Sequence, residues 1–169
     1  MENTDGAHPY IARNIGPIRK LGGDNPHGLY LDTPIDGRDT YRIRGQKGSA
    51  GWASFQIQRC HAALGKGLSI FGGHLLLPAL QTDAQGRFEI GVGPEPQAGQ
   101  WIVSDEYSEV MVIRQFFNDP DDVRPMDLSI ENLSRGHTPK RPLTLADASQ
   151  KLAGAGQLFQ LMVPVMQQM

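Results

Sequence analysis

The sequence predicts a mainly β protein with an antiparallel β-sandwich or jelly-roll-like core and a C-terminal helix. The 169 residues include 20 glycines and 12 prolines, which separate short elements. Several segments alternate apolar and polar residues with the period of two that marks a half-buried strand. The tail instead has helical spacing. We expect an irregular arm over 1–22, a β-sandwich domain over 23–135, and a linker with a helical tail over 136–169.

The stretch 23–45, GDNPHGLYLDTPIDGRDTYRIRG, predicts the first β-hairpin. Its first half alternates Leu29 and Leu31 with polar neighbours, and its second half alternates Tyr41 and Ile43 with arginines. The Asp-Gly pair between the halves is typical of hairpin turns, because it tolerates positive φ. We therefore expect the two halves to pair with each other.

Further strands follow, separated by turn residues. They are predicted at 51–58, 86–92, 101–103, 109–117 and 127–133. The Gly-rich segment 64–80 fits either a bent strand or a loose excursion. The longest run, EVMVIRQFF, is apolar on both faces, which suits a central strand covered on both sides. Short strands at this spacing favour an antiparallel sandwich or a jelly roll.

The tail is predicted to be helical from the N-cap Thr144 onward. Its apolar stripe consists of Leu152, Ala155, Leu158, Phe159 and Met162. Pro164 should kink or end the helix. A tail with this much apolar surface needs a cover, so we expect it to mediate a homo-oligomer or docking to a further domain.

Composition and charge exclude several classes of function. A formal net charge of -2 provides no basic field for phosphates, so we expect no nucleic-acid partner. The polar N-terminus lacks a signal-peptide core, and no apolar run is long enough to span a membrane. We therefore expect a soluble, cytoplasmic chain without a membrane partner. The single cysteine, Cys60, excludes an internal disulfide.

The order of several motifs resembles the family that carries the domain of unknown function 1214. The motifs are the early hairpin, Gly86–Ile90 (GRFEI), the step from Pro96 to Trp101, and Ile113–Phe116 (IRQF). The resemblance covers about 23–133. It implies an all-β sandwich core in proteins that are often longer than this chain, and it implies no settled activity.

Arg114 is the most informative single residue. It shares a face of its strand with Val110, Val112 and Phe116, so its stem should be buried. A buried guanidinium needs a partner, because an unpaired buried charge is costly. Two interpretations remain: a clamp for an anionic ligand, or a core salt bridge to an acid such as Glu89 or Asp105.

Other residues complete the set of candidates. The predicted ligand-binding residues are Tyr30, Asp32, Arg44, Trp101 and Arg114. Tyr30, Trp52 and Trp101 could stack on sugar faces, although core packing is the commoner use of aromatic side chains. The histidines lack metal-ligand spacing, and the acidic turn 118–122 lacks the spacing of a calcium loop. We therefore expect no metal and no cofactor.

No stretch of the sequence specifies a reaction, and no catalytic residue is assigned. We expect a ligand-binding or assembly module. The alternative is an enzyme that acts on a small anionic or carbohydrate-like substrate held by buried arginines, with Asp32 or a histidine as the acting group. A fold of this kind hosts many functions, so the fold alone does not choose between them.

Overall fold

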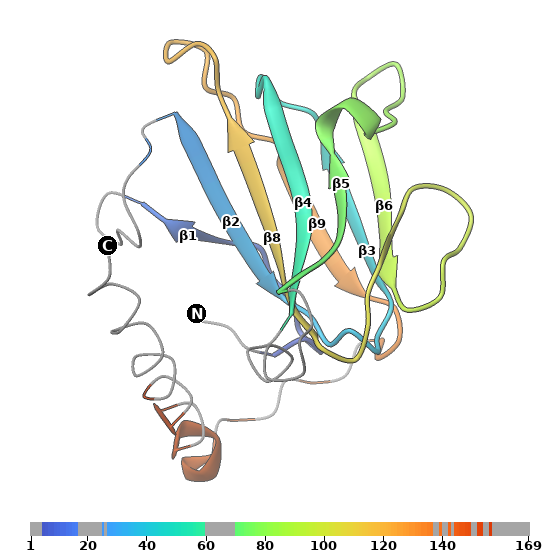
Figure 1. Ribbon diagram of the computed structural model, residues 1–169, viewed down its shortest axis with the longest axis vertical. Coiled ribbons are helices and arrows are strands. Elements are labelled where there is room, and N and C mark those ends of the chain that lie inside the picture. Colours follow the sequence, from blue (N-terminus) through green and yellow to red (C-terminus); the bar gives the residue numbers. More distant parts are fainter. Residues whose placement is uncertain are drawn as a thin grey trace. The chain divides into compact units, whose positions relative to one another are not determined.

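The computed structural model describes residues 5–16, 25, 27–59, 70–136, 139, 142, 144–149, 152, 153 and 156. The chain divides into two compact units, Met1–Thr138 and Pro139–Met169, which we describe separately. The strands of the first unit are β1 (Ala12–Ile15), β2 (Gly28–Pro34), β3 (Tyr41–Gln46), β4 (Trp52–Arg59), β5 (Phe71–Leu76), β6 (Arg87–Gly93), β7 (Trp101–Val103), β8 (Ser108–Phe116) and β9 (Asp127–Asn132) (Figure 1). A short 3-10 helix, Leu77–Ala79, follows β5.

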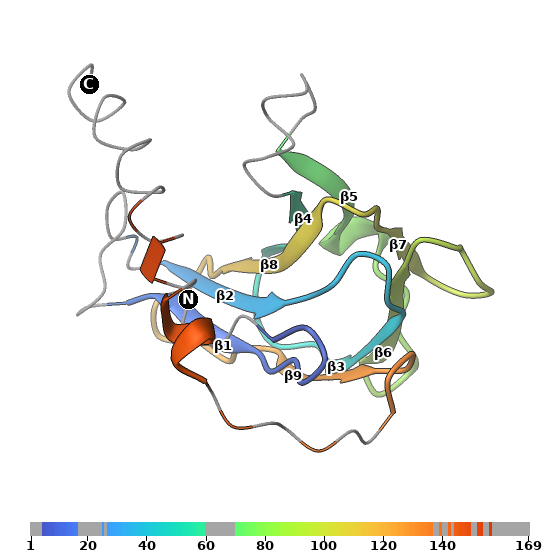
Figure 2. The same ribbon diagram turned by 90° about the horizontal axis from the view of Figure 1, so that it is seen from below.

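These strands form two sheets. The five-stranded sheet has the order β1-β2-β8-β4-β5, and the four-stranded sheet has the order β7-β6-β3-β9. Figure 2 shows the two sheets as facing layers. The pairing is antiparallel except between β6 and β7, which run parallel. The predicted fold class, mainly β with antiparallel sheets and a C-terminal helix, is confirmed.

The two sheets bury one face each in a shared hydrophobic core. Ala53, Phe55 and Ile57 of β4 point inward from the five-stranded sheet, and all three are fully buried. Phe55 meets Phe88 of the four-stranded sheet edge to face, with ring centroids 5.9 Å apart. The predicted alternation therefore assigns the inward residues correctly, because each strand places every second side chain in this core.

The predicted hairpin over 23–45 is wrong, although both of its strands exist. β2 pairs with β1 and β8 in one sheet, whereas β3 pairs with β6 and β9 in the other. The chain crosses between the layers through a connection that starts at the buried Ile35. There the amide of Gly37 donates to the carbonyl of Ser108 at 3.0 Å. Both strands alternate because both line the same core, and alternation does not reveal which sheet a strand joins.

β8 is the middle strand of the five-stranded sheet, as its apolar run predicts. Val110 and Val112 point away from the core, yet they are only 7% and 6% exposed. The outer face of this sheet is thus buried along its centre. Two strands were not assigned from the sequence. β1 is a short strand with an irregular register within the expected arm, and β5 contains the Gly-Gly pair that made its segment ambiguous.

The second unit begins its helix as predicted. Residues 145–149, 152, 153 and 156 are helical, and Thr144 caps them. The Thr144 hydroxyl accepts from the Asp147 amide at 3.2 Å, and the Asp147 carboxylate accepts from the Thr144 amide at 2.8 Å. This is a reciprocal capping box. Of the predicted apolar stripe, Ala155, Leu158, Phe159, Met162 and the kink at Pro164 lie outside the described residues. Within the described part, no helix is long and apolar enough to cross a membrane.

The crossing between the layers generates a prediction about Gly37. A Cβ there would lie 1.8 Å from the backbone oxygen of Asp105, which cannot move aside as a flexible side chain can. Gly37→Ala should therefore lower the free energy of unfolding by about 1–3 kcal/mol in urea titrations. Gly16→Ala is the matched control, because its Cβ meets only the flexible Arg13 side chain at 3.2 Å. Equal stability of the two variants would contradict the tight approach.

Candidate functional site

The predicted ligand-binding residues lie on two different outer faces. Tyr30, Asp32 and Arg114 belong to the five-stranded sheet, whereas Arg44 and Trp101 belong to the four-stranded sheet. Because β2 and β3 enter different layers, Tyr30 and Asp32 do not share a face with Arg44. The candidate set therefore divides into two surfaces, which we take in turn.

On the five-stranded sheet, the strand registers place Arg114 at the middle of the outer face. Tyr30 of β2 and Ser54 of β4 lie directly opposite Arg114 on the strands to either side. In the next row, Asp32 and Gln56 flank Val112 in the same way. Side chains directly opposite each other on one face interact, so this registry brings Arg114 beside polar and aromatic neighbours.

Arg114 is half-buried and bonds to a neutral partner. Its Nη1 donates to Oε1 of Gln56 at 2.8 Å, and no carboxylate of the described residues lies within 4.0 Å of it. The expected salt bridge to Glu89 or Asp105 is wrong. Glu89 lies on the other sheet, where it pairs with Arg44 at 2.9 Å, and Asp105 pairs with Arg59 at 2.6 Å.

Aromatic rings border Arg114 on one side. Tyr30 and Phe116 meet edge to face with centroids 5.8 Å apart, and Phe116 lies 5.2 Å from Trp52. Gly28 provides the room for the first pair, because a Cβ there would come within 2.9 Å of the Tyr30 ring. Trp52 remains 39% exposed. The three rings therefore form a continuous aromatic surface, which we call the aromatic row.

Two polar side chains of this face are buried. Ser54 is 3% exposed, and its hydroxyl has no hydrogen-bond partner among the described residues. Asp32 is 8% exposed and engages in a polar interaction of its own. A buried hydroxyl without a partner costs free energy, and such groups are rare in folded proteins. The region around Arg114 is thus polar, partly dry and incompletely paired.

The outer face of the four-stranded sheet carries a different arrangement. Arg42 and Arg44 of β3 lie between Glu89 of β6 and Glu131 of β9, with N–O distances from 2.9 to 3.8 Å. Beside them is a depression of about 530 Å³. Arg44 is 53% exposed and already bonded to two carboxylates, so it has little capacity to hold a further anion.

Trp101 supports the parallel pair of β6 and β7. Its six-membered ring occupies the space that a side chain at Gly91 would take, since a Cβ there would lie 2.1 Å from two ring carbons. Its indole N–H donates to the carbonyl of Gly93 at 3.1 Å. A hollow of about 290 Å³ adjoins the ring. Packing on β6 thus accounts for the position of Trp101.

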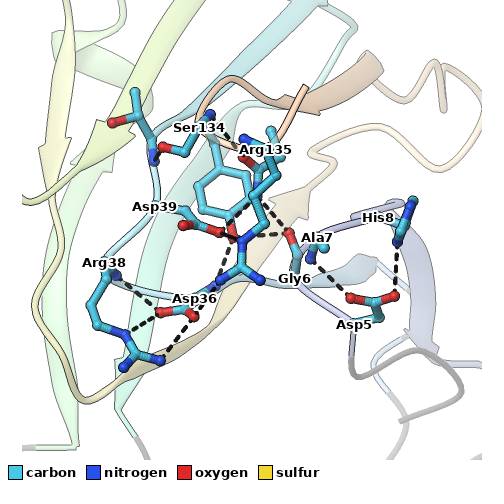
Figure 3. A network of polar contacts seen from close by, with 12 residues as sticks. Asp5, Gly6, Ala7, His8, Asp36, Arg38, Asp39, Ser134 and Arg135 are labelled. Carbon is cyan, nitrogen blue, oxygen red and sulfur yellow. Dashed lines mark hydrogen bonds and ion pairs between the residues drawn. The ribbon is translucent and has the colours of Figure 1, made fainter. Parts of the chain in front are cut away.

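A polar network at the end of the first unit was missed from the sequence (Figure 3). Arg135 donates from Nε to Asp39 at 2.6 Å and from Nη2 to Asp36 at 2.9 Å. The fully buried Tyr41 donates its hydroxyl to the carbonyl of Gly6 at 2.9 Å. The sequence feature that could have indicated this network is Tyr41, because the hydroxyl of a buried tyrosine usually has a hydrogen-bond partner.

The network shifts the protonation of its members. The hydrogen bond from Arg38, with the nearby charge of Arg135, holds the pKa of Asp36 below its ordinary value despite burial. The hydrogen bond to Asp39 raises the pKa of Arg135. Burial raises the pKa of Tyr41 and keeps its phenol protonated. These are the properties of a structural clamp that joins the N-terminal arm to the residues after β9.

The remaining sequence candidates give no site in the described part of the chain. No group of three His, Cys, Asp or Glu side chains there could hold a metal ion. In the acidic turn, Asp119 accepts from the amide of Asp121, and Asp122 pairs with Arg124 at 2.7 Å. His27 and His74 are exposed. Cys60, His61 and the segment 65–67 lie outside the described residues.

Comparison with known proteins gives a structural relative. No protein-family model and no curated protein sequence matches the chain. The crystal structure of an uncharacterized protein from Burkholderia cenocepacia is similar, with a TM-score of 0.77 and 30% sequence identity. The match covers 86% of this chain and 40% of that chain. The chain thus spans about two fifths of the relative's length, and the matched part of the relative has the same mainly β fold.

The clamp generates a prediction about acid stability. Arg135→Gln should lower the free energy of unfolding by about 1–2 kcal/mol at pH 7, since Arg135 is partly exposed and screened. Asp36 has a lowered pKa in the folded state. Its contribution is therefore present above the unfolded pKa of about 4 and is lost as pH falls through the folded value.

Urea titrations at pH 7 and pH 3 test this dependence. The difference between wild type and Arg135→Gln should shrink at the lower pH. Arg124→Gln is the control, because Arg124 is 73% exposed and pairs with Asp122 on the surface. It should cost less than about 0.5 kcal/mol at either pH. A cost for Arg135→Gln that is independent of pH would refute the electrostatic origin.

Proposed function

We propose that the first unit binds a small anionic ligand on the outer face of the five-stranded sheet, with Arg114 as the anion-binding group. The proposal rests on the burial and the hydrogen bonding of Arg114. It is half-buried, and its hydrogen bond among the described residues goes to the neutral amide of Gln56. A guanidinium has five N–H donors in a fixed fork that matches a carboxylate.

Several other arginines of the first unit differ from Arg114 in this respect. Arg42, Arg44, Arg59 and Arg135 all contact carboxylates within 4.0 Å. Their charges are compensated, which suits a structural role. The charge of Arg114 is compensated by no described carboxylate, and an anion brought to it would make a charge-assisted pair in a partly dry setting.

We also propose that this two-sheet unit is a β-sandwich of the domain of unknown function 1214 family, in a cytoplasmic protein. The order along the sequence of GRFEI, the step from Pro96 to Trp101, and IRQF supports the family. The motif IRQF lies on β8, and its arginine is Arg114 itself. The proposed site would then fall within the part of the chain that carries the resemblance.

A thermal-shift screen with acetate, phosphate, sulfate and citrate tests the site. An anion at about one hundred times its Kd stabilises a folded protein by about 2.7 kcal/mol, which raises the Tm by several degrees. Arg114→Gln should abolish this shift, because it removes the charge. Arg44→Gln, with the same change on the other sheet, should retain the shift. An equal loss in both variants, or no shift in wild type, would reject the proposal.

A second candidate function is assembly through the second unit. Leu145 and Leu152 are 89% and 74% exposed. They lie seven residues apart, so they occupy one face of the helix. Fully burying a leucine is worth about 1.5–3 kcal/mol, which favours covering this face with a partner. We propose that a second copy of the chain provides the cover.

Substitution of both leucines tests the assembly proposal. Leu145→Gln together with Leu152→Gln should convert a dimer into a monomer in light scattering, because the apolar face is lost. The Arg114→Gln variant is the control and should keep the oligomeric state of wild type. A wild-type chain that is monomeric at high concentration would eliminate this candidate function.

A further inference from the structure

We infer that the anionic ligand of Arg114 is a carboxylate carried on a single aromatic ring, as in benzoate. The inference rests on the proposed function and specifies its ligand class. It is drawn from the neighbours of Arg114 on the outer face of the five-stranded sheet. Aromatic neighbours lie on one side of Arg114 and polar neighbours on the other. This arrangement determines which way a bound ligand points.

The aromatic side is the row formed by Tyr30, Phe116 and Trp52. Phe116 lies two residues beyond Arg114 on β8, on the same face of the sheet. Tyr30 lies opposite Arg114 on β2, and Trp52 lies opposite Phe116 on β4. The Phe116 ring contacts Tyr30 and Trp52, with centroid distances of 5.8 and 5.2 Å. A flat apolar ring placed here would gain edge or face contacts with more than one of them.

The polar side lies in the opposite direction along the strands. Asp32 and Gln56 flank Val112, which precedes Arg114 by two residues. Because Asp32 and Gln56 make this side polar, the apolar part of a ligand held by Arg114 extends toward the aromatic row instead. Two residues along a strand span about 6.6 Å, which is close to the length of a one-ring carboxylate.

Ser54 and Gln56 complete the polar end of the site. Ser54 lies opposite Arg114, and its buried hydroxyl has no partner among the described residues. A hydroxyl rotates freely to donate, so it can serve one oxygen of a carboxylate while Arg114 serves both. Gln56 bonds to Nη1 of Arg114 and thereby fixes the guanidinium. The carboxylate of the ligand would thus accept hydrogen bonds from the Arg114 guanidinium and from the Ser54 hydroxyl.

Simpler ligands use only part of this surface. An inorganic anion or acetate would engage Arg114 and leave the aromatic row uncovered. A neutral aromatic alcohol would cover the row and leave the guanidinium without an anion. A carboxylate on a ring engages both, and it places its charge and its apolar area where the protein offers the matching groups.

Calorimetric titration with sodium benzoate, sodium acetate and benzyl alcohol separates the contribution of the charge from that of the aromatic ring. Benzoate should bind about three- to tenfold more tightly than acetate, the gain expected from one aromatic contact. Benzyl alcohol should bind more weakly than benzoate, since it lacks the charge. Equal affinities for benzoate and acetate, both lost in Arg114→Gln, would overturn the inference and leave the proposed anion site intact. No binding of either salt, together with no thermal shift from phosphate, sulfate or citrate, would reject both.

Variants of the aromatic row provide the matched test. Trp52→Ala should remove most of the preference for benzoate and leave the acetate affinity unchanged. Trp52 is 39% exposed near the start of β4, so its truncation should not unfold the sheet. Phe71→Ala is the control, because Phe71 is an exposed aromatic residue on β5 of the same sheet, and the preference should persist in it. A preference that survives Trp52→Ala and Phe116→Leu would contradict a role for the aromatic row.

Discussion

The mutual burial of two sheet faces is the constraint on which the rest of this structure depends. Each sheet has one apolar face, and neither face could stay in water, so both sheets close on one core around Phe55 and Phe88. That closure fixes which side chains point inward on every strand. It therefore also fixes the two outer faces, where Arg114 and Trp101 lie. The position of each candidate residue thus follows from the core packing of its neighbours on the same strand, such as Ile113 beside Arg114 and Ile102 beside Trp101.

Local pattern in the sequence predicted the strands and their inward residues, but it could not predict their partners. The alternation in β2 and β3 shows that each strand has a buried face, and the same alternation fits a hairpin or two separate sheets. The decisive feature is the close approach of Gly37 to the backbone at Asp105, sixty-odd residues away in the chain. Non-local contacts of this kind leave no local signature. β1 was missed for a related reason, since a four-residue strand is too short to show a period.

The site illustrates the same limit. Arg114 is conspicuous in the sequence because a charged residue interrupts an apolar strand, and the structure shows that this residue is half-buried. Phe116 is predictable as a neighbour because it lies two residues along the same strand, whereas Ser54 and Gln56 are not, because they come from the pairing of β4 with β8. Arg44 and Trp101 were predicted for the same site, although each has a local role on the other sheet. The alternation of apolar and polar residues predicts whether a side chain is buried, whereas its neighbours on the same face depend on the order of the strands in the sheet.

The contacts at Gly6 bring the two ends of the first unit close together. The amide of Asn132 donates to the carbonyl of Gly6 at 3.0 Å, so the start and the end of the first unit lie side by side. A unit whose ends meet can be inserted into another polypeptide, or followed by one, without strain on its host. In the Burkholderia cenocepacia relative, most of the length lies outside the match. Ends that lie close together allow such a unit to be joined to further chain without distorting its two sheets.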